Sequence, residues 1–195
     1  MVEVKNSIRP GIMIIVSAVN RVTNRPFFYI VHKMKNEIII LEDGRKVAID
    51  RSVGVVLIPV VKSKGKILIL CNQRGTKTSE AKLKWNLPSG YLDWGETGEE
   101  AARRECLEEC GVDIPLDLIQ EVEHSTSPEE NRQNVIFRYL AILPESFLNL
   151  KTAAEDNSEV ISIKWIPTDE LDNYNFAWSQ RRTIKRILTN SGLGF

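Results

Sequence analysis

Runs of apolar residues separated by short polar turns dominate the first third of the chain and predict a succession of β-strands. These runs are rich in the β-branched and aromatic residues that strands favour. Turn signals such as Asn24-Arg25-Pro26 and Asp43-Gly44 lie between them. We expect strands at 12–19, 27–34, 37–43 and 45–50, then two buried strands at 52–61 and 66–73 that are joined by a hairpin turn at 63–66.

A helical pattern replaces the strand pattern after residue 97. Thr97 and Glu100 have the spacing of a capping box, in which each side chain accepts a hydrogen bond from the other residue's backbone. Gly111 stands where a residue in the left-handed conformation often ends a helix, so we expect a helix over 98–110. Its apolar stripe recurs every four residues, at Ala102, Cys106 and Cys110.

Strand-like runs return in the second half of the chain. We expect strands at 118–125, 134–143 and 160–166, and a closing helix over 176–190 that ends before Gly192. We interpret Trp85 and Trp165 as core residues. Strands on both sides of a helix, followed by a second helix, favour an α/β class sandwich with a mixed sheet and flanking helices. We expect 1–50 to form an N-terminal strand extension and 51–195 to form the main domain.

Composition narrows the class of protein. The chain has 195 residues, of which 43% are apolar and 27% charged, and its 26 basic residues balance its 26 acidic ones. A balanced charge gives no support to a nucleic-acid or membrane-surface binder, and no apolar run reaches the roughly 20 residues that span a bilayer. Three cysteines without a C-x-x-C motif favour neither a disulfide framework nor a zinc site. The expected compartment is the cytoplasm.

The predicted helix carries an unusual cluster of acidic residues. Glu105, Glu108 and Glu109 lie three and four positions apart, so they share one face and repel each other. One interpretation is a solvated acidic face that Arg103 and Arg104 partly compensate. The other is a site for Mg²⁺, which prefers carboxylate oxygens and completes its shell with water and substrate phosphates.

The residues around this cluster match a known family motif. The stretch from Gly90 to Val112 resembles the Nudix box, G-x5-E-x7-R-E-U-x-E-E-x-G-U, where U is a bulky apolar residue. The fixed positions are filled by Gly90, Glu96, Arg104, Glu105, Glu108, Glu109 and Gly111, and the apolar ones by Cys106 and Val112. The segment WNLPSGYL resembles the usual entry to the box, with Ser89 in place of a glycine. Residues 41–60 resemble the ADP-ribose and nucleotide-sugar pyrophosphatase branch, and the resemblance extends to about residue 171.

The resemblance implies an α/β/α sandwich and a Mg²⁺-dependent hydrolase, with Mn²⁺ as a possible substitute. The substrate would be a nucleoside diphosphate linked to another group, split into a nucleoside monophosphate and a phosphorylated remainder. The implied metal ligands are Glu105, Glu108, Glu109 and the backbone carbonyl of Ser89. Arg104 would orient the carboxylates, Glu96 would hold Arg104 or its loop, and Gly90 and Gly111 would be backbone positions.

Residues other than those at the fixed positions of the box are candidates for the remaining roles. Many relatives place a further acid in a loop, and here Glu155, Asp156 and Glu159 are available. We favour Glu159 as general base and additional metal ligand, against the alternative of a solvated loop acid. Arg74 is a candidate for phosphate binding. The candidates for stacking on a base are Tyr91, Trp94, Phe176 and Trp178.

The sequence is compatible with more than one class of substrate. ADP-ribose or a related nucleotide sugar comes first, and a nucleoside triphosphate or dinucleoside polyphosphate comes second. The alternative from another class is a nucleotide-binding sensor without activity, which loss of a box glutamate would favour; none is lost. We expect a small-molecule nucleotide partner, no nucleic acid, no membrane and a possible homodimer through the N-terminal strands.

Overall fold

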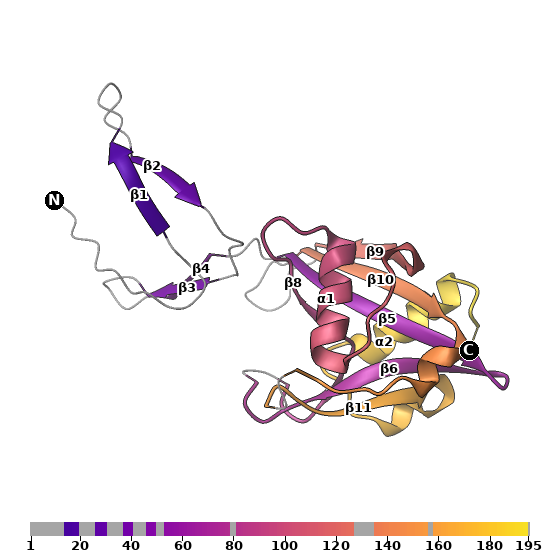
Figure 1. The fold of residues 1–195 in the computed structure, drawn as a ribbon. Helices are drawn as coiled ribbons and strands as arrows, with labels where there is room; N and C mark the ends of the chain where they lie inside the picture. The colour runs from indigo at the N-terminus through magenta and orange to yellow at the C-terminus, as the bar shows by residue number, and fades with distance from the viewer. Residues whose placement is uncertain are drawn as a thin grey trace. The chain divides into compact units, whose positions relative to one another are not determined.

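The computed structural model describes the backbone of residues 14–19, 26–30, 37–40 and 46–49, and describes residues 53–78, 81–126, 135–155 and 158–194 in full. The chain divides into two compact units (Figure 1). One comprises Met1–Asp50 with Asp93–Gly95, and the other comprises Arg51–Leu92 with Glu96–Phe195.

The described residues of the first unit form two antiparallel strand pairs. Strand β1 (Ile14–Val19) pairs with β2 (Pro26–Ile30), and β3 (Glu37–Ile40) pairs with β4 (Lys46–Ile49). All four fall within or overlap the strands expected from the sequence, and the remaining ends of those strands lie outside the described residues. A role for this unit in dimerisation stays a prediction.

A mixed sheet forms the centre of the second unit. Its order is β11 (Val160–Pro167), β6 (Lys66–Arg74), β5 (Val53–Ser63), β10 (Val135–Leu143) and β9 (Ile119–Ser125). Only β5 and β10 run parallel among these neighbours. The turn between β5 and β6 has positive φ at Lys64 (49°) and Gly65 (76°), as the predicted tight hairpin requires.

Strand β5 changes partner along its length. Its C-terminal half pairs with β6, from Val60 to Ser63, whereas its N-terminal half, from Gly54 to Val56, pairs with the short strand β8 (Ser89–Tyr91). Strand β7 (Trp85–Asn86) pairs with the end of β6. The segment that carries β7 and β8 therefore lies beside the point where β6 leaves β5.

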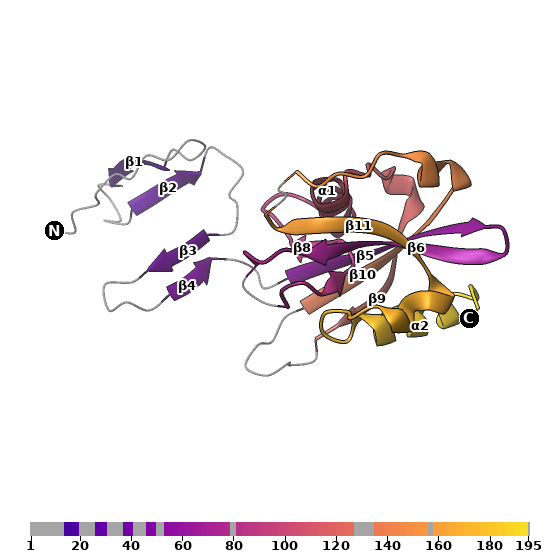
Figure 2. The same cartoon turned by 90° about the horizontal axis from the view of Figure 1, so that it is seen from below.

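Helices cover both faces of this sheet. Figure 2 shows α1 (Gly98–Cys110) on one side and α2 (Gln180–Asn190) on the other. The described residues of this unit also form short 3₁₀ helices, at Leu116–Leu118, Glu145–Asn149 and Thr168–Asn173. The expected α/β sandwich is confirmed.

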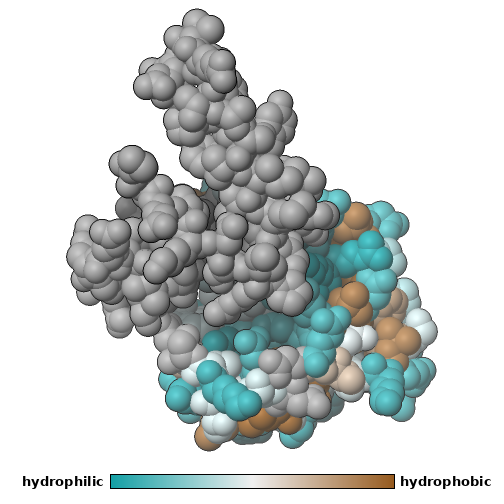
Figure 3. All heavy atoms as spheres, turned by 60° about the vertical axis from the view of Figure 1, so that its left-hand side comes forward, coloured by the Kyte–Doolittle hydropathy of each residue, from teal (hydrophilic) through white to brown (hydrophobic). Residues whose placement is uncertain are grey.

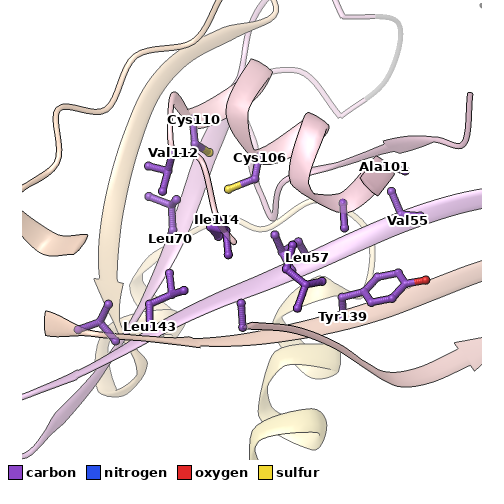
Figure 4. Packing of buried hydrophobic residues seen from close by; sticks show 14 residues of the cluster. Val55, Leu57, Leu70, Ala101, Cys106, Cys110, Val112, Ile114, Tyr139 and Leu143 are labelled. Atoms are coloured by element: carbon purple, nitrogen blue, oxygen red, sulfur yellow. The ribbon is translucent and has the colours of Figure 1, made fainter. Parts of the chain in front are cut away.

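Each face of the sheet has its own core, because successive residues of a strand point to opposite sides. Leu57 packs in the cluster beneath α1, together with Cys106 and Cys110, and Figure 4 shows these side chains between the helix and the strands. Its neighbour Ile58 packs in the cluster beneath α2, together with Ile184. The predicted stripe of α1 is confirmed, since all three of its members are fully buried.

Two details differ from the expectation. Helix α2 begins at Gln180, four positions later than residue 176, because Phe176 forms a β-bridge with Trp85 instead. Trp85 is 7% exposed, as expected of a core residue, and Trp165 packs against the α1 cluster but is only partly buried.

Among the described residues no helix is long and apolar enough to cross a membrane. On the described surface visible in Figure 3, hydrophobic residues stand among hydrophilic ones.

Candidate functional site

Local signals fix both ends of the acidic helix α1. The Thr97 backbone N–H donates to Glu100 Oε2 at 2.7 Å, and the Glu100 N–H donates to Thr97 Oγ1 at 3.3 Å, which completes the predicted capping box. At the other end Gly111 is left-handed, with φ 69°, and a Cβ there would lie 2.4 Å from the Ala153 carbonyl oxygen. A side chain at position 111 is therefore excluded both by conformation and by space.

Gly90 allows the helix to approach β8 closely. A Cβ on Gly90 would lie 2.1 Å from Glu105 Oε1, so the Glu105 carboxylate occupies the space that a side chain would fill. Burial raises the pKa of Glu105, the adjacent Arg104 guanidinium opposes that rise, and the net pKa is raised. The glycine of the box is thus explained by the carboxylate that rests against it.

Arg104 gathers the carboxylates at this end of the helix. Its Nε and Nη2 donate to the two oxygens of Glu96 at 3.1 and 2.8 Å, and its Nη1 donates to Glu105 Oε1 at 2.6 Å. A longer contact of 3.5 Å reaches Glu108 Oε2. Nη2 also donates to the Tyr91 carbonyl at 2.9 Å, which ties the loop before α1 to the helix. Such bidentate, charge-assisted bonds are strong and directional.

Glu109 faces the strands instead of Arg104. Its Oε2 accepts hydrogen bonds from Asn72 Nδ2 at 2.8 Å and from the Ser89 backbone N–H at 3.0 Å. Burial is the largest cause that raises the pKa of Glu109, and the nearby charge of Glu105 is the second. The two hydrogen bonds lower the pKa, but the net result is a pKa of about 8. The three glutamates of the predicted metal set therefore point to two different environments.

A small pocket brings Glu109 together with residues from outside the box. It has a volume of about 170 Å³, and its lining includes Arg74, Lys77 and Glu159 besides Glu109. We call it the acidic pocket. Two carboxylates and two basic side chains in one pocket suit a phosphate group that is bound together with a cation.

The position of Glu159 follows from the way β11 joins β6. Val160 pairs with Arg74, and the Gly75 N–H donates to the Glu159 carbonyl at 2.6 Å. A Cβ on Gly75 would lie 2.2 Å from the Ser158 carbonyl oxygen, so glycine permits this close approach. Glu159 is thereby held at the rim where β6 ends.

The two other loop acids are placed differently. The Glu155 N–H donates to the Glu108 carbonyl at 2.8 Å, and the Ala153 N–H donates to the Cys110 carbonyl at 3.1 Å. These bonds satisfy carbonyl groups that the end of a helix leaves open. Asp156 lies outside the described residues.

A chain of buried amides supports this site, and the sequence analysis missed it. Gln180 of α2 accepts from the Leu87 N–H at 2.7 Å and donates to Asn86 Oδ1. Asn86 Nδ2 then donates to Ser89 Oγ at 3.0 Å, and the Ser89 N–H reaches Glu109. A polar residue within an otherwise apolar strand or on a buried helix stripe was the available signal. Asn72 was visible in the same way, and it is fully buried.

The four aromatic candidates lie in three different settings. Tyr91 and Trp94 are 42% and 38% exposed, and neither is among the described residues that line the acidic pocket. Trp178 is 52% exposed, and its ring lies under the Arg74 guanidinium, whose Cζ is 5.2 Å from the ring centroid. Phe176 is buried.

The oxygen donors of the site fit a hard divalent cation. Within the described ranges no three Asp, Glu, His or Cys side chains gather into a metal-binding group, because Arg104 engages Glu105 and Glu108 while Glu109 faces the pocket. Mg²⁺ is usually bound through one or two carboxylates, with water and phosphate in its other positions. Asn72 Oδ1 is buried and has no hydrogen-bond partner in the structure, so one further oxygen donor stands beside Glu109.

Comparison with known proteins gives a consistent family signal. A family model described as NUDIX domain matches residues 50–187. Nudix hydrolase 6 of Arabidopsis thaliana is 27% identical over 106 residues, which are 54% of this chain and 35% of that protein. The chain spans less than half the length of the first curated relatives that it matches, 44% and 35%.

Solved structures share the fold. The NUDIX domain of Shewanella oneidensis NrtR, crystallised with ADP ribose, has a TM-score of 0.59 and 19% identity, over 71% of this chain and 86% of that one. A Caenorhabditis elegans Ap4A hydrolase, in a binary complex, has a TM-score of 0.55 and 20% identity, over 73% and 98%. At these identities the likeness establishes the fold.

Proposed function

Because the chain belongs to the Nudix family, we propose that it is a hydrolase of pyrophosphate bonds in nucleoside diphosphates that are linked to a second group. ADP-ribose and nucleotide sugars are the first substrates in this proposal. The observation that carries it is the acidic pocket, where Glu109 of the box shares one cavity with Arg74, Lys77 and Glu159.

Each pocket residue has a role in the proposed reaction. Arg74 and Lys77 bind the phosphate oxygens, and Arg is suited to bidentate phosphate contact. Glu159 accepts a proton from the attacking water, whose oxygen forms a bond to phosphorus while the bridging P–O bond breaks. The products are a nucleoside monophosphate and a phosphorylated remainder, and the bridging oxygen leaves on one of them.

Mg²⁺, or Mn²⁺ in its place, would be held by Glu109 and Glu159, with Glu105, Glu108 and the Ser89 carbonyl as further ligands. When bound, it would neutralise charge on the pyrophosphate and lower the pKa of a bound water. Arg104 orients Glu105 and Glu108 through the contacts described above, and Glu96 fixes Arg104. Gly90 and Gly111 shape the backbone.

The substrate class rests on weaker support than the reaction class. The Shewanella domain was crystallised with ADP ribose, whereas the C. elegans relative is named an Ap4A hydrolase. A cytoplasmic location, homodimerisation and the absence of nucleic-acid partners stay predictions from the sequence.

A substrate panel tests the proposal. ADP-ribose, ADP-sugars, GDP-sugars, dinucleoside polyphosphates and nucleoside triphosphates are incubated with the protein in Mg²⁺, in Mn²⁺ and in EDTA, and released phosphate monoesters are counted. We expect metal-dependent cleavage of ADP-ribose or a nucleotide sugar. Preferred cleavage of a triphosphate or dinucleoside would overturn the substrate class. Nucleotide binding without any cleavage would replace the enzyme with a sensor.

A further inference from the structure

A second and larger pocket lies on the segment that precedes α2. It has a volume of about 360 Å³ and is lined by residues between Asp172 and Arg181, including Tyr174, Phe176 and Trp178. We call it the aromatic pocket. Its volume falls in the range of small-molecule sites, and its aromatic lining suits a flat ring.

The backbone around this pocket is tied firmly to β7. The Trp85 N–H donates to the Asn175 carbonyl at 2.9 Å, and the Ala177 N–H donates to the Trp85 carbonyl at 2.8 Å. The Tyr174 ring packs edge-on against the Trp85 ring, with 5.2 Å between centroids. The pocket is thus built on the strand that leads directly into Ser89 and the box.

Trp178 has a backbone conformation that is unusual for a bulky residue. Its φ is 46°, a left-handed value that a bulky residue rarely adopts. The residue is 52% exposed, so core burial does not compensate for this conformation. Strained residues that the surrounding structure holds in place are often found at ligand sites.

Arg74 connects the two pockets. Its guanidinium lies 5.2 Å from the centre of the Trp178 ring, which lines the aromatic pocket, and Arg74 itself lines the acidic pocket. A ligand with a phosphate on one side of Arg74 and a flat ring on the other would contact both. A nucleotide has this construction.

We propose that the aromatic pocket binds the nucleobase of the nucleotide whose phosphates lie in the acidic pocket, with Trp178 as the stacking residue. The base site rests on the proposed function in one respect, which is that the ligand is a nucleotide. The exposed amides of Asn173 and Asn175 are available to the base edge as donors and acceptors. The Asp172 carboxylate already pairs with Arg181 at 3.5 Å and Lys185 at 3.1 Å, so its charge is offset. The stacking role therefore passes from Tyr91 and Trp94 to Trp178.

Equilibrium binding of reaction-product analogues tests this without requiring turnover. AMP, GMP, CMP and UMP are titrated calorimetrically into the full chain, together with ribose 5-phosphate, which lacks the base. At least one nucleotide should bind more than tenfold tighter than ribose 5-phosphate. Trp178→Ala should weaken that nucleotide roughly tenfold to hundredfold, the usual scale of base stacking on an aromatic ring.

Comparison variants separate stacking from other effects. Ribose 5-phosphate should bind Trp178→Ala within twofold of wild type, and Trp178→Phe, which keeps a ring, should stay within threefold for the nucleotide. Ile142→Ala is the control, because Ile142 is 50% exposed and is not among the described residues that line either pocket.

Three results would overturn the proposal. The first is a wild-type protein that binds no nucleotide more tightly than ribose 5-phosphate. The second is an unchanged nucleotide affinity in Trp178→Ala, or a loss that appears in Trp94→Ala instead. The third is an equal loss for ribose 5-phosphate, which would assign Trp178 to phosphate binding through Arg74. A protein that cleaves nothing in the substrate panel but shows the expected binding would refute the hydrolase and leave the base site standing.

Discussion

Two adjacent arginines of α1 show how differently one residue type can act on two flanks of a helix. Arg103 makes two short bonds to Asp113, at 2.6 and 2.9 Å, but both side chains are about half exposed, at 42% and 53%. Arg104 is 22% exposed, and its main partner Glu96 is 5% exposed. The geometry of the Arg103 pair is as good as that of the Arg104 pair, so burial and the number of partners distinguish them.

The difference has an energetic consequence. An exposed ion pair contributes about 0–1 kcal/mol even when its geometry is good, because water screens it. A buried carboxylate that loses its partner is left with an uncompensated charge, which costs much more than the pair gained. We therefore expect the two flanks of α1 to respond very differently to matched substitutions.

The largest expected effect is on the Arg104 flank. Arg104→Met should lower the free energy of unfolding by roughly 2–3 kcal/mol, somewhat below the usual cost for a fully buried pair because Arg104 is partly exposed. It should also reduce turnover roughly tenfold to hundredfold, the usual effect of losing a group that orients metal ligands. Urea denaturation and a metal-dependent hydrolysis assay measure the two effects. Arg103→Met is the matched control, and equal losses in both variants would refute the contrast.

Gly90→Ala should disturb the Arg104 flank of α1 from the neighbouring strand β8. The new methyl group would meet Glu105 Oε1 at 2.1 Å, so the Glu105 carboxylate has to move away from its position beside Arg104. We expect turnover to fall at least about tenfold, with a stability loss of roughly 1–3 kcal/mol from overpacking. Gly54→Ala is the control on the neighbouring strand, since its Cβ would have an ordinary contact of 3.6 Å. If Gly90→Ala kept full turnover, the close packing of Glu105 on β8 would have no functional meaning.

The smallest expected effect is on the Arg103 flank, at its partner Asp113. The hydrogen bond from Arg103 lowers the pKa of Asp113 below its ordinary value. A carboxyl group whose pKa is lower in the folded state adds stability above its unfolded pKa, near 3.8, and loses it as the pH falls through the folded pKa. Asp113→Asn should therefore cost less than about 1 kcal/mol at pH 7, and variant and wild type should converge as the pH falls below the lowered pKa of Asp113. A difference that grows on acidification would show that the sign is wrong.

Local signals made α1 predictable. The capping box at Thr97 and the left-handed Gly111 act within one turn of the helix, so the sequence alone located both ends. The start of α2 was not predictable, because the strained φ of Trp178 accompanies backbone bonds to Trp85, far away in the sequence. The spacing of residues in a helical sequence pattern gives no information about contacts with distant segments.

The site was predictable only in part for the same reason. The spacing of Glu105, Glu108 and Glu109 shows that they share a helix face, but not which partner each one finds. Glu109 turns toward Asn72 and Ser89, which lie on strands. The spacing of residues within the helix does not predict which strand residues lie beside it. The amide chain through Gln180 depends on three elements meeting, and only the fold brings them together.

In the proposed reaction, the acidic face of α1 supports metal-dependent hydrolysis through Glu109. We would compare Glu109→Gln with Glu99→Gln, a matched change on the same helix at a position that the box motif leaves free. Turnover is measured in Mg²⁺, and Mn²⁺ binding is followed by electron paramagnetic resonance. We predict that Glu109→Gln stays folded, loses at least about hundredfold in turnover and binds Mn²⁺ more weakly, whereas Glu99→Gln behaves as wild type. Near-wild-type turnover and Mn²⁺ binding in Glu109→Gln would refute the proposed role of Glu109 in metal binding and hydrolysis.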